Sequence, residues 1–311
     1  MTRPDDAYLD ANQLKTVERH AARLLKDASA IGVFPTPVDR LMEAAKLTVV
    51  DDSFLNDDVI AQFIRKAKAS ITSNIKSALS KVLGLIHVPE RLVLIDKDMP
   101  VPKRPFIKLH EAGHGTLPHQ SKVYSLIHDC EKTLDPEITD LFEREANVFA
   151  AEAMFQGGLF AEEAHQSAFA IKVPLELATK YGASKYSTFR RYVSTNPSAC
   201  CVIVLEPVVK GVGKEFSAQI RRVIVSKTFH VNFDLAAFGP AIGHRHLLGH
   251  MVPIGRRMTA RRNIKLTDRN GATRKCSAEA FDTKHQIFIL IQDHGLAPSK
   301  IMLPSRVAIS S

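Results

Sequence analysis

The residues of this sequence that could do chemistry are concentrated in one stretch, which reads His-Glu-x-x-His from His110 to His114. On a helix, residues four apart lie on one face, so the two histidines can present their imidazoles to a single ion. Zinc, held at about 2.0–2.1 Å from each nitrogen, suits such a pair. Glu111 projects beside them, where it could take a proton from a metal-bound water. The alternative is a chance match on an ordinary amphipathic helix, and a third ligand would decide between the two.

Proline and glycine residues around this stretch indicate that it lies on a helix. Pro102 and Pro105 stand just upstream, and proline is tolerated in a first helical turn but not further in. Gly115 and Pro118 then supply signals that end the helix. We therefore expect His110 and His114, four residues apart, to lie on the same face of a helix.

A second informative helix is expected from Ile138 to Phe155, where apolar residues recur at helical spacing. At about 100° per residue, these apolar positions form one buried face. Glu145 points with that face, whereas Glu143 points roughly 160° away from it. Because burying an unpaired carboxylate is costly, Glu145 should have a partner. Either a zinc ion or a buried Arg or Lys would serve.

Together, the two helices supply a set of zinc ligands with an open fourth position for water: His110, His114 and Glu145. An open position is typical of catalytic rather than structural zinc sites. Glu143 is the fallback ligand, because it lies four residues before Asn147 and the two side chains could act together. Glu152, about two turns beyond Glu145, is placed to orient a ligand or the substrate.

The other elements of the N-terminal part must position these two helices. Helices are expected at residues 10–31, 39–46 and 57–82, and strands at 47–50 and 92–95. Residues 174–193 resemble a helix-turn-helix, whose second helix carries Lys185, Arg190 and Arg191 and could meet phosphates. A helical hairpin that packs beneath the catalytic helices is the structural alternative, and we favour it.

Beyond Thr195-Asn196-Pro197 the pattern changes to short apolar runs separated by turns that contain Gly or Pro. This pattern indicates strands, which we expect at residues 199–205, 222–226, 229–233 and 286–291. The residues after Pro304 are expected to form a loose tail.

The composition indicates a globular protein with a basic C-terminal half. The chain has 311 residues, 45% hydrophobic and 24% charged, and a net charge of +9. Between Lys210 and Lys275 about fourteen Lys and Arg stand against three acids, which could form a face for nucleic acid, a face for an acidic partner, or a solvated surface. We do not favour the nucleic-acid interpretation.

The sequence also predicts where the protein acts. It shows neither a signal segment nor an apolar run of about 18 residues that could span a membrane. Its four cysteines lack C-x-x-C spacing, and the adjacent Cys200 and Cys201 lie in an apolar run, where we expect them to fill a strand rather than form a disulfide. We therefore expect a reducing cytoplasm and no contact with membrane.

The sequence resembles the ImmA/IrrE family of bacterial metallopeptidases. The resemblance rests on two motifs, Arg104 to His114 with its Gly113, and Glu143 to Glu152. The helical pair from Leu177 to Tyr192 follows as in relatives. The chain departs from the family where Met154-Phe155-Gln156 replaces the usual Leu-Met-Pro, and residues 54–83 look like extra length. Residues 200–311 do not match, although some relatives carry a sensor-like domain there.

The resemblance implies a zinc endopeptidase in which His110, His114 and Glu145 hold the metal and Glu111 is the general base. The substrate in such families is often a DNA-binding repressor of the helix-turn-helix type. An additional donor should stabilise the oxyanion, and three side chains are candidates: His119, Tyr124 and His128. The alternative function is a DNA-binding transcriptional regulator that uses residues 174–193 and the basic C-terminal half.

The predicted architecture is α+β. A mainly helical, zincin-like N-terminal half with a small sheet and a helix-turn-helix-like pair is followed by a β-rich C-terminal domain. We assign residues 1–160 to a zinc metallopeptidase domain, 161–196 to a helix-turn-helix-like segment, and 197–311 to a C-terminal domain that senses a signal or binds substrate.

Overall fold

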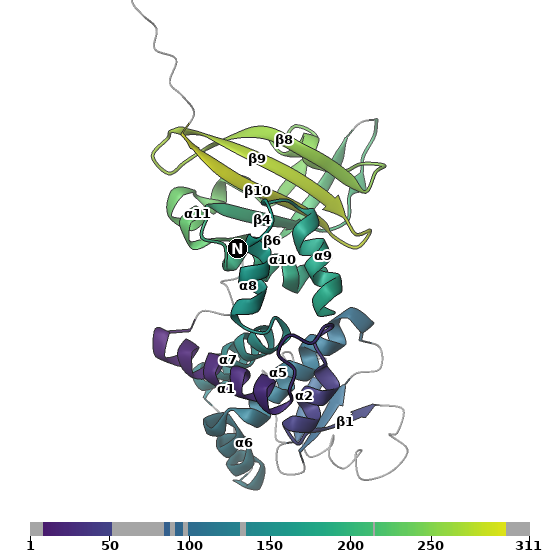
Figure 1. Ribbon diagram of the computed structural model, residues 1–311. Helices are drawn as coiled ribbons and strands as arrows, with labels where there is room; N and C mark the ends of the chain where they lie inside the picture. The colour runs from purple at the N-terminus through teal and green to yellow at the C-terminus, as the bar shows by residue number, and fades with distance from the viewer. Residues whose placement is uncertain are drawn as a thin grey trace, which may run out of the picture. The chain divides into compact units, whose positions relative to one another are not determined.

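A computed structural model describes residues 9–51, 84–87, 91–95, 99–130, 135–213 and 215–296. The chain divides into two compact units, Met1–Tyr192 and Val193–Ser311, and Figure 1 shows their elements. The first unit is mainly helical and the second is built on a large antiparallel sheet, so the α+β prediction is confirmed. Among the described residues, no helix is both long and apolar enough to cross a membrane.

The first unit begins with the helix that the sequence predicts. α1 (Ala11–Asp27) starts at Asp10, whose carboxylate accepts hydrogen bonds from the backbone N–H groups of Asn12 and Gln13. The Gln13 side chain in turn accepts from the Asp10 backbone N–H, so three backbone donors at the helix start are satisfied. The short helix α2 (Val38–Ala44) follows, as expected.

A small sheet lies next in the chain. It contains β1 (Thr48–Asp51), β2 (Gly84–His87) and β3 (Leu92–Ile95) in the order β1-β3-β2. β1 runs parallel to β3, and β2 runs antiparallel to it. The strands expected at 47–50 and 92–95 are confirmed, β2 was not predicted, and the helix expected at 57–82 lies outside the described residues.

Three helices then form the centre of this unit. They are α5 (Arg104–Thr116), α6 (Pro118–Cys130) and α7 (Pro136–Met154). α5 packs against α7 on one side and against β2 and β3 on the other. Gly113 permits the close approach, because a Cβ atom there would lie 3.1 Å from Ala146 Cα and 3.3 Å from Phe149 Cβ. The two helices predicted to carry the site are therefore in direct contact.

Three shorter helices complete the unit: α8 (Gly158–His165), α9 (Lys172–Tyr181) and α10 (Lys185–Ser194). α9 ends at Gly182, whose φ of 68° is readily adopted only by glycine. On α10, Arg191 forms an ion pair with Glu152 of α7 and donates to the Gly157 carbonyl. This contact favours the helical hairpin over a DNA-reading pair. It also corrects the expectation for Glu152, which binds Arg191 instead of orienting a ligand.

The second unit is a seven-stranded sheet in the order β5-β6-β4-β10-β9-β8, with β7 pairing to β6. Its strands are β4 (Cys200–Leu205), β5 (Val209–Lys210), β6 (Phe216–Val225), β7 (Ala241–Gly243), β8 (Met258–Thr267), β9 (Thr273–Asp282) and β10 (Ile287–Leu296). The strands expected at 199–205, 222–226 and 286–291 are confirmed within β4, β6 and β10.

One strand prediction is wrong. Residues 229–233 lie largely in a short helix, α11 (Lys227–Asn232). The Ser226 hydroxyl accepts a hydrogen bond from the Phe229 backbone N–H and so caps the helix start. Phe229 is fully buried in the core on one side of the sheet. Cys200 and Cys201 are free and buried, as strand filling requires.

Candidate metal centre

Two imidazoles on α5 form the centre of the site. His110 and His114 are both buried, and their Nε2 atoms lie 3.2 Å apart. The predicted i,i+4 convergence is therefore present in the fold.

The Nδ1 atom of each imidazole contacts a side-chain amide. Gln120 of α6 places its Oε1 2.7 Å from His114 Nδ1, and Asn147 of α7 places its Oδ1 3.2 Å from His110 Nδ1. The orientation of the Gln120 amide is determined, because its Nε2 donates to the Glu145 carboxylate and to the Phe142 carbonyl. An amide oxygen only accepts, so His114 Nδ1 must carry the proton. Asn147 Oδ1 faces His110 Nδ1 in the same way, so the Nε2 atoms of both rings are available to a cation or a proton between them.

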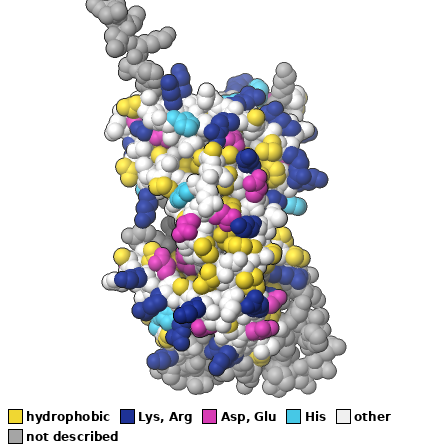
Figure 2. All heavy atoms as spheres, in the orientation of Figure 1, with side chains coloured by type: hydrophobic (Ala, Val, Ile, Leu, Met, Phe, Trp, Pro, Cys, Tyr) yellow, Lys and Arg dark blue, Asp and Glu magenta, His cyan; other side chains and the backbone are white. Residues whose placement is uncertain are grey.

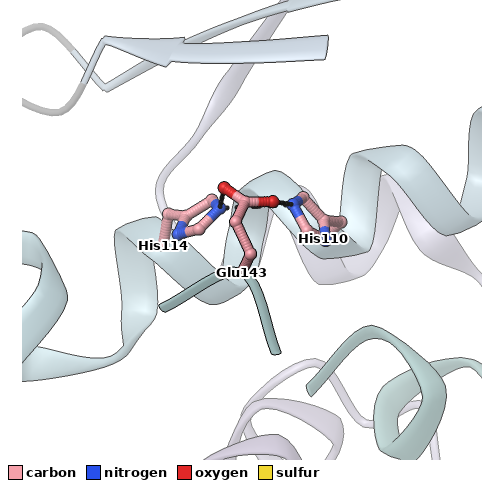
Figure 3. Close-up of side chains that lie close together, drawn as sticks. All are labelled: His110, His114 and Glu143. Carbon is pink, nitrogen blue, oxygen red and sulfur yellow. Dashed lines mark hydrogen bonds and ion pairs between the residues drawn. The ribbon is translucent and has the colours of Figure 1, made fainter. Parts of the chain in front are cut away.

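Glu143 is the acid that faces both rings. Its Oε2 lies 3.3 Å from His110 Nε2 and its Oε1 lies 3.5 Å from His114 Nε2, as Figure 3 shows. Among the described residues, these three side chains form the one group of His, Cys, Asp and Glu that could hold a metal. The Glu143 side chain retains 46% of its surface exposed, so the site is open on this side.

Glu145, the acid that the helical-wheel argument favoured, does not face the two rings. It is buried, as predicted, but its Oε2 accepts from Gln120 Nε2 at 2.6 Å and lies 2.6 Å from His119 Nε2. The polar partner that a buried carboxylate needs is supplied by α6 and not by a metal. The fallback ligand, Glu143, occupies the place expected for Glu145.

The three ligand atoms fit a zinc ion. Two ligands at about 2.0–2.1 Å from zinc in tetrahedral geometry lie roughly 3.3–3.4 Å from each other. The two Nε2 atoms are 3.2 Å apart, which is close to this value, and each Nε2 lies 3.3 or 3.5 Å from a different oxygen of Glu143. One ligand atom from each of the three side chains lies within 4.8 Å of the other two. The donor set of two imidazoles and one carboxylate is also one that catalytic zinc sites use.

Comparison with known proteins agrees with this geometry. Residues 71–191 match the family model of the M78 peptidases, described as the IrrE N-terminal-like domain. The match includes α5, α6 and α7, so every residue of the metal centre lies inside the M78 domain. The metallopeptidase resemblance read from the two motifs is thereby confirmed for this domain.

One solved structure, a Mycobacterium tuberculosis transcriptional regulator, matches over 93% of this chain and 77% of its own at 14% identity, with a TM-score of 0.48. No curated protein matches the sequence.

Glu111 of the M78 domain is a buried carboxyl group next to the two histidines. Burial raises its pKa, Glu143 raises it further, and His110 and His114 oppose the shift. A raised pKa suits a group that must both accept and return a proton near neutral pH. Burial alone would lower the pKa of His114, but Glu143, Glu111 and Gln120 together raise it.

The structure separates the three candidate oxyanion donors. His119 is bound to Glu145 on the far side of Gln120 from the Nε2 atoms. Tyr124 packs its ring edge-to-face on His114 at a centroid distance of 5.3 Å. Burial, Glu143 and Glu111 all raise the pKa of Tyr124, so its hydroxyl remains a donor at neutral pH. The side chain of His128 lies outside the described residues.

Proposed function

We propose that this protein is a zinc-dependent endopeptidase whose metal ligands are His110, His114 and Glu143. The observation that carries the proposal is the convergence of the two Nε2 atoms, 3.2 Å apart, with the Glu143 carboxylate, whose oxygens lie 3.3 and 3.5 Å from them, and the buried Glu111 beside them. When bound, zinc would polarise the peptide carbonyl and lower the pKa of the attacking water. The match to the M78 peptidases supports hydrolysis of peptide bonds.

The chain's own residues would then move the proton and hold the developing charge. Glu111 would accept a proton from the attacking water and pass it to the leaving amine. Of the two candidates whose side chains are described, Tyr124 is the better placed to donate to the oxyanion, because it adjoins His114 and stays protonated. Gln120 and Asn147 would keep the imidazole rings in the tautomer that presents Nε2.

An extended peptide could bind along β2. This strand packs against α5, and among the described residues no strand pairs with its outer edge. A peptide that adds to such an edge gains backbone hydrogen bonds independent of its sequence. A protein substrate, and in particular a helix-turn-helix repressor as the family resemblance implies, would need an exposed extended segment that can pair with β2.

We propose that this activity occurs in the reducing cytoplasm, with which the free cysteines Cys200, Cys201 and Cys276 are compatible.

The test uses the full chain with zinc and purified repressors encoded near its gene. We expect a discrete cleavage product that disappears with a chelator and returns with added zinc. Glu111→Gln should abolish cleavage and keep the metal, whereas Glu137→Gln, the same change at an exposed position of α7, should leave both unchanged. A purified protein without stoichiometric metal after reconstitution, or full activity of Glu111→Gln, would refute the proposal.

A further inference from the structure

The second unit carries the entire excess of positive charge. Residues 193–311 contain 17 Lys and Arg against seven Asp and Glu, a net charge of +10, whereas residues 1–192 contain 25 against 26. Figure 2 shows one face of the molecule, with many Lys and Arg side chains and few acidic ones over the β-rich unit. Such an asymmetry creates a field that attracts polyanions.

Much of the acidic charge in this unit is neutralised locally. Asp268 and Asp293 are buried against Arg274, and Glu279 binds Arg261 at 2.7 Å. Each of these acids is held beside an arginine, and the lysines of this unit carry charge that these pairs do not cancel.

A pair of lysines marks the centre of the basic surface. Lys265 of β8 lies directly opposite Lys275 of β9, and both are exposed. Their neighbours Ile264 and Cys276 belong to the core, so by strand alternation the lysines lie on the other face of the sheet. Among the described residues, no carboxylate lies within ion-pair distance of either lysine. Like charges directly opposite each other destabilise a strand pair, and a bound anion would remove that repulsion.

The flanking pairs on the same face are hydrogen-bonding residues. Thr267 lies opposite Thr273 on one side of the lysines, and Asn263 lies opposite Ser277 on the other. Ser277 is buried and its hydroxyl lies 2.8 Å from His294 Nε2, so the exposed polar groups are those of Thr267, Thr273 and Asn263. Hydroxyl and amide groups beside lysines are the side chains that contact phosphate oxygens. These pairs contain no apolar side chain, whereas the centre of a protein–protein interface is enriched in aromatic residues and depleted of charge.

From these observations we infer that the outer face of β8 and β9, centred on Lys265 and Lys275, binds the phosphate backbone of nucleic acid without reading its sequence. The surface differs from the one expected from the sequence at residues 174–193, where Arg191 is engaged by Glu152. The inference is independent of the proposed peptidase activity, because it involves no residue of the metal centre.

The experiment is a fluorescence-anisotropy titration of a labelled duplex DNA of arbitrary sequence with the full chain, repeated from 50 to 200 mM salt. Replacing both lysines, Lys265→Gln with Lys275→Gln, should reduce the slope of log affinity against log salt by about 2. Over this range the wild type should then lose about tenfold more affinity than the variant. The matched control, Lys15→Gln with Lys26→Gln, removes the same charge from exposed positions of α1 and should behave as the wild type.

Three outcomes would overturn the inference. The wild type fails to bind the duplex at 50 mM salt, or both double variants lose affinity equally, or polyglutamate of matched charge displaces the DNA as well as unlabelled duplex does. The last result would indicate an acidic protein as the partner. A chelator should leave DNA binding unchanged, and this separates the result from that of the cleavage assay.

Discussion

Replacing Gln120 by leucine should weaken the metal centre although Gln120 is not one of its ligands. Gln120 is fully buried and holds three groups together: its Oε1 faces His114 Nδ1 at 2.7 Å, and its Nε2 donates to Glu145 at 2.6 Å and to the Phe142 carbonyl at 3.3 Å. Leucine has a similar size but can make none of these bonds. The change therefore removes the polar contacts while leaving the packing nearly intact.

The expected magnitude follows from the groups that lose a partner. A buried N–H left unsatisfied on His114 costs about 1–3 kcal/mol, and the lost hydrogen bond to the Glu145 carboxylate costs about 1.5–3 kcal/mol. The free energy of unfolding should therefore fall by roughly 3–5 kcal/mol, a large part of the stability of a typical domain. His119 still binds Glu145, which limits the loss. Because the His114 ring is no longer held in one tautomer and orientation, metal affinity should fall by about 10–100-fold.

Two measurements test this reasoning: zinc affinity by competition with a coloured chelator, and the free energy of unfolding by urea titration. Gln166→Leu, the same change at an exposed position, should alter neither. Asn147→Leu should weaken metal binding through the other imidazole, and it provides a milder variant should Gln120→Leu fail to fold. If Gln120→Leu binds zinc as tightly as the wild type, the amide does not position the ligand and our account of the site is wrong.

Three further predictions, two of which compare a pair of variants, distinguish the roles of individual residues. Glu143→Gln should reduce zinc affinity by more than about tenfold, whereas Glu145→Gln should lower thermal stability but keep stoichiometric zinc by metal analysis; the reverse result would restore the ligand expected from the sequence. Gly113→Ala should destabilise the protein by about 1–3 kcal/mol in urea, because the added Cβ would lie 3.1 Å from the backbone of α7, while Gly158→Ala, with open space around it, should be nearly neutral. Gln156→Pro, which restores the family's usual residue, should destabilise by about 3 kcal/mol or more, because Gln156 has a φ of 52° that proline cannot adopt; an unchanged melting temperature would contradict this.

Several features of the fold could be predicted because they depend on local sequence. The i,i+4 spacing of His110 and His114 places both imidazoles on one face of any helix, whatever packs against it. The amphipathic patterns of α1 and α7 likewise give their buried faces directly. By contrast, β8 and β9 were missed, because the exposed positions of β8 are largely basic or polar and the buried positions of β9 hold small residues (Cys, Ser and Ala) that do not indicate a strand. β9 pairs with β10, and β8 pairs with β9, and this pairing stabilises both segments as strands.

The third ligand shows where sequence reasoning stops. A helical wheel gives the direction of each side chain relative to its own helix, and it placed Glu145 correctly on the buried face of α7. It gives no information about which neighbouring element covers each part of that face. The packing of α6 brings Gln120 and His119 to Glu145, and the crossing of α5 brings the histidines to Glu143 instead.

The sequence by itself therefore determined that two histidines share one face of a helix, with Glu111 beside them, and that a second helix later in the chain carries further acids. Only the tertiary structure decided which acid faces the two histidines and which amides contact the imidazoles. The physical reason is that spacing along a helix depends on backbone geometry alone, whereas the meeting of two side chains from different helices depends on how those helices cross.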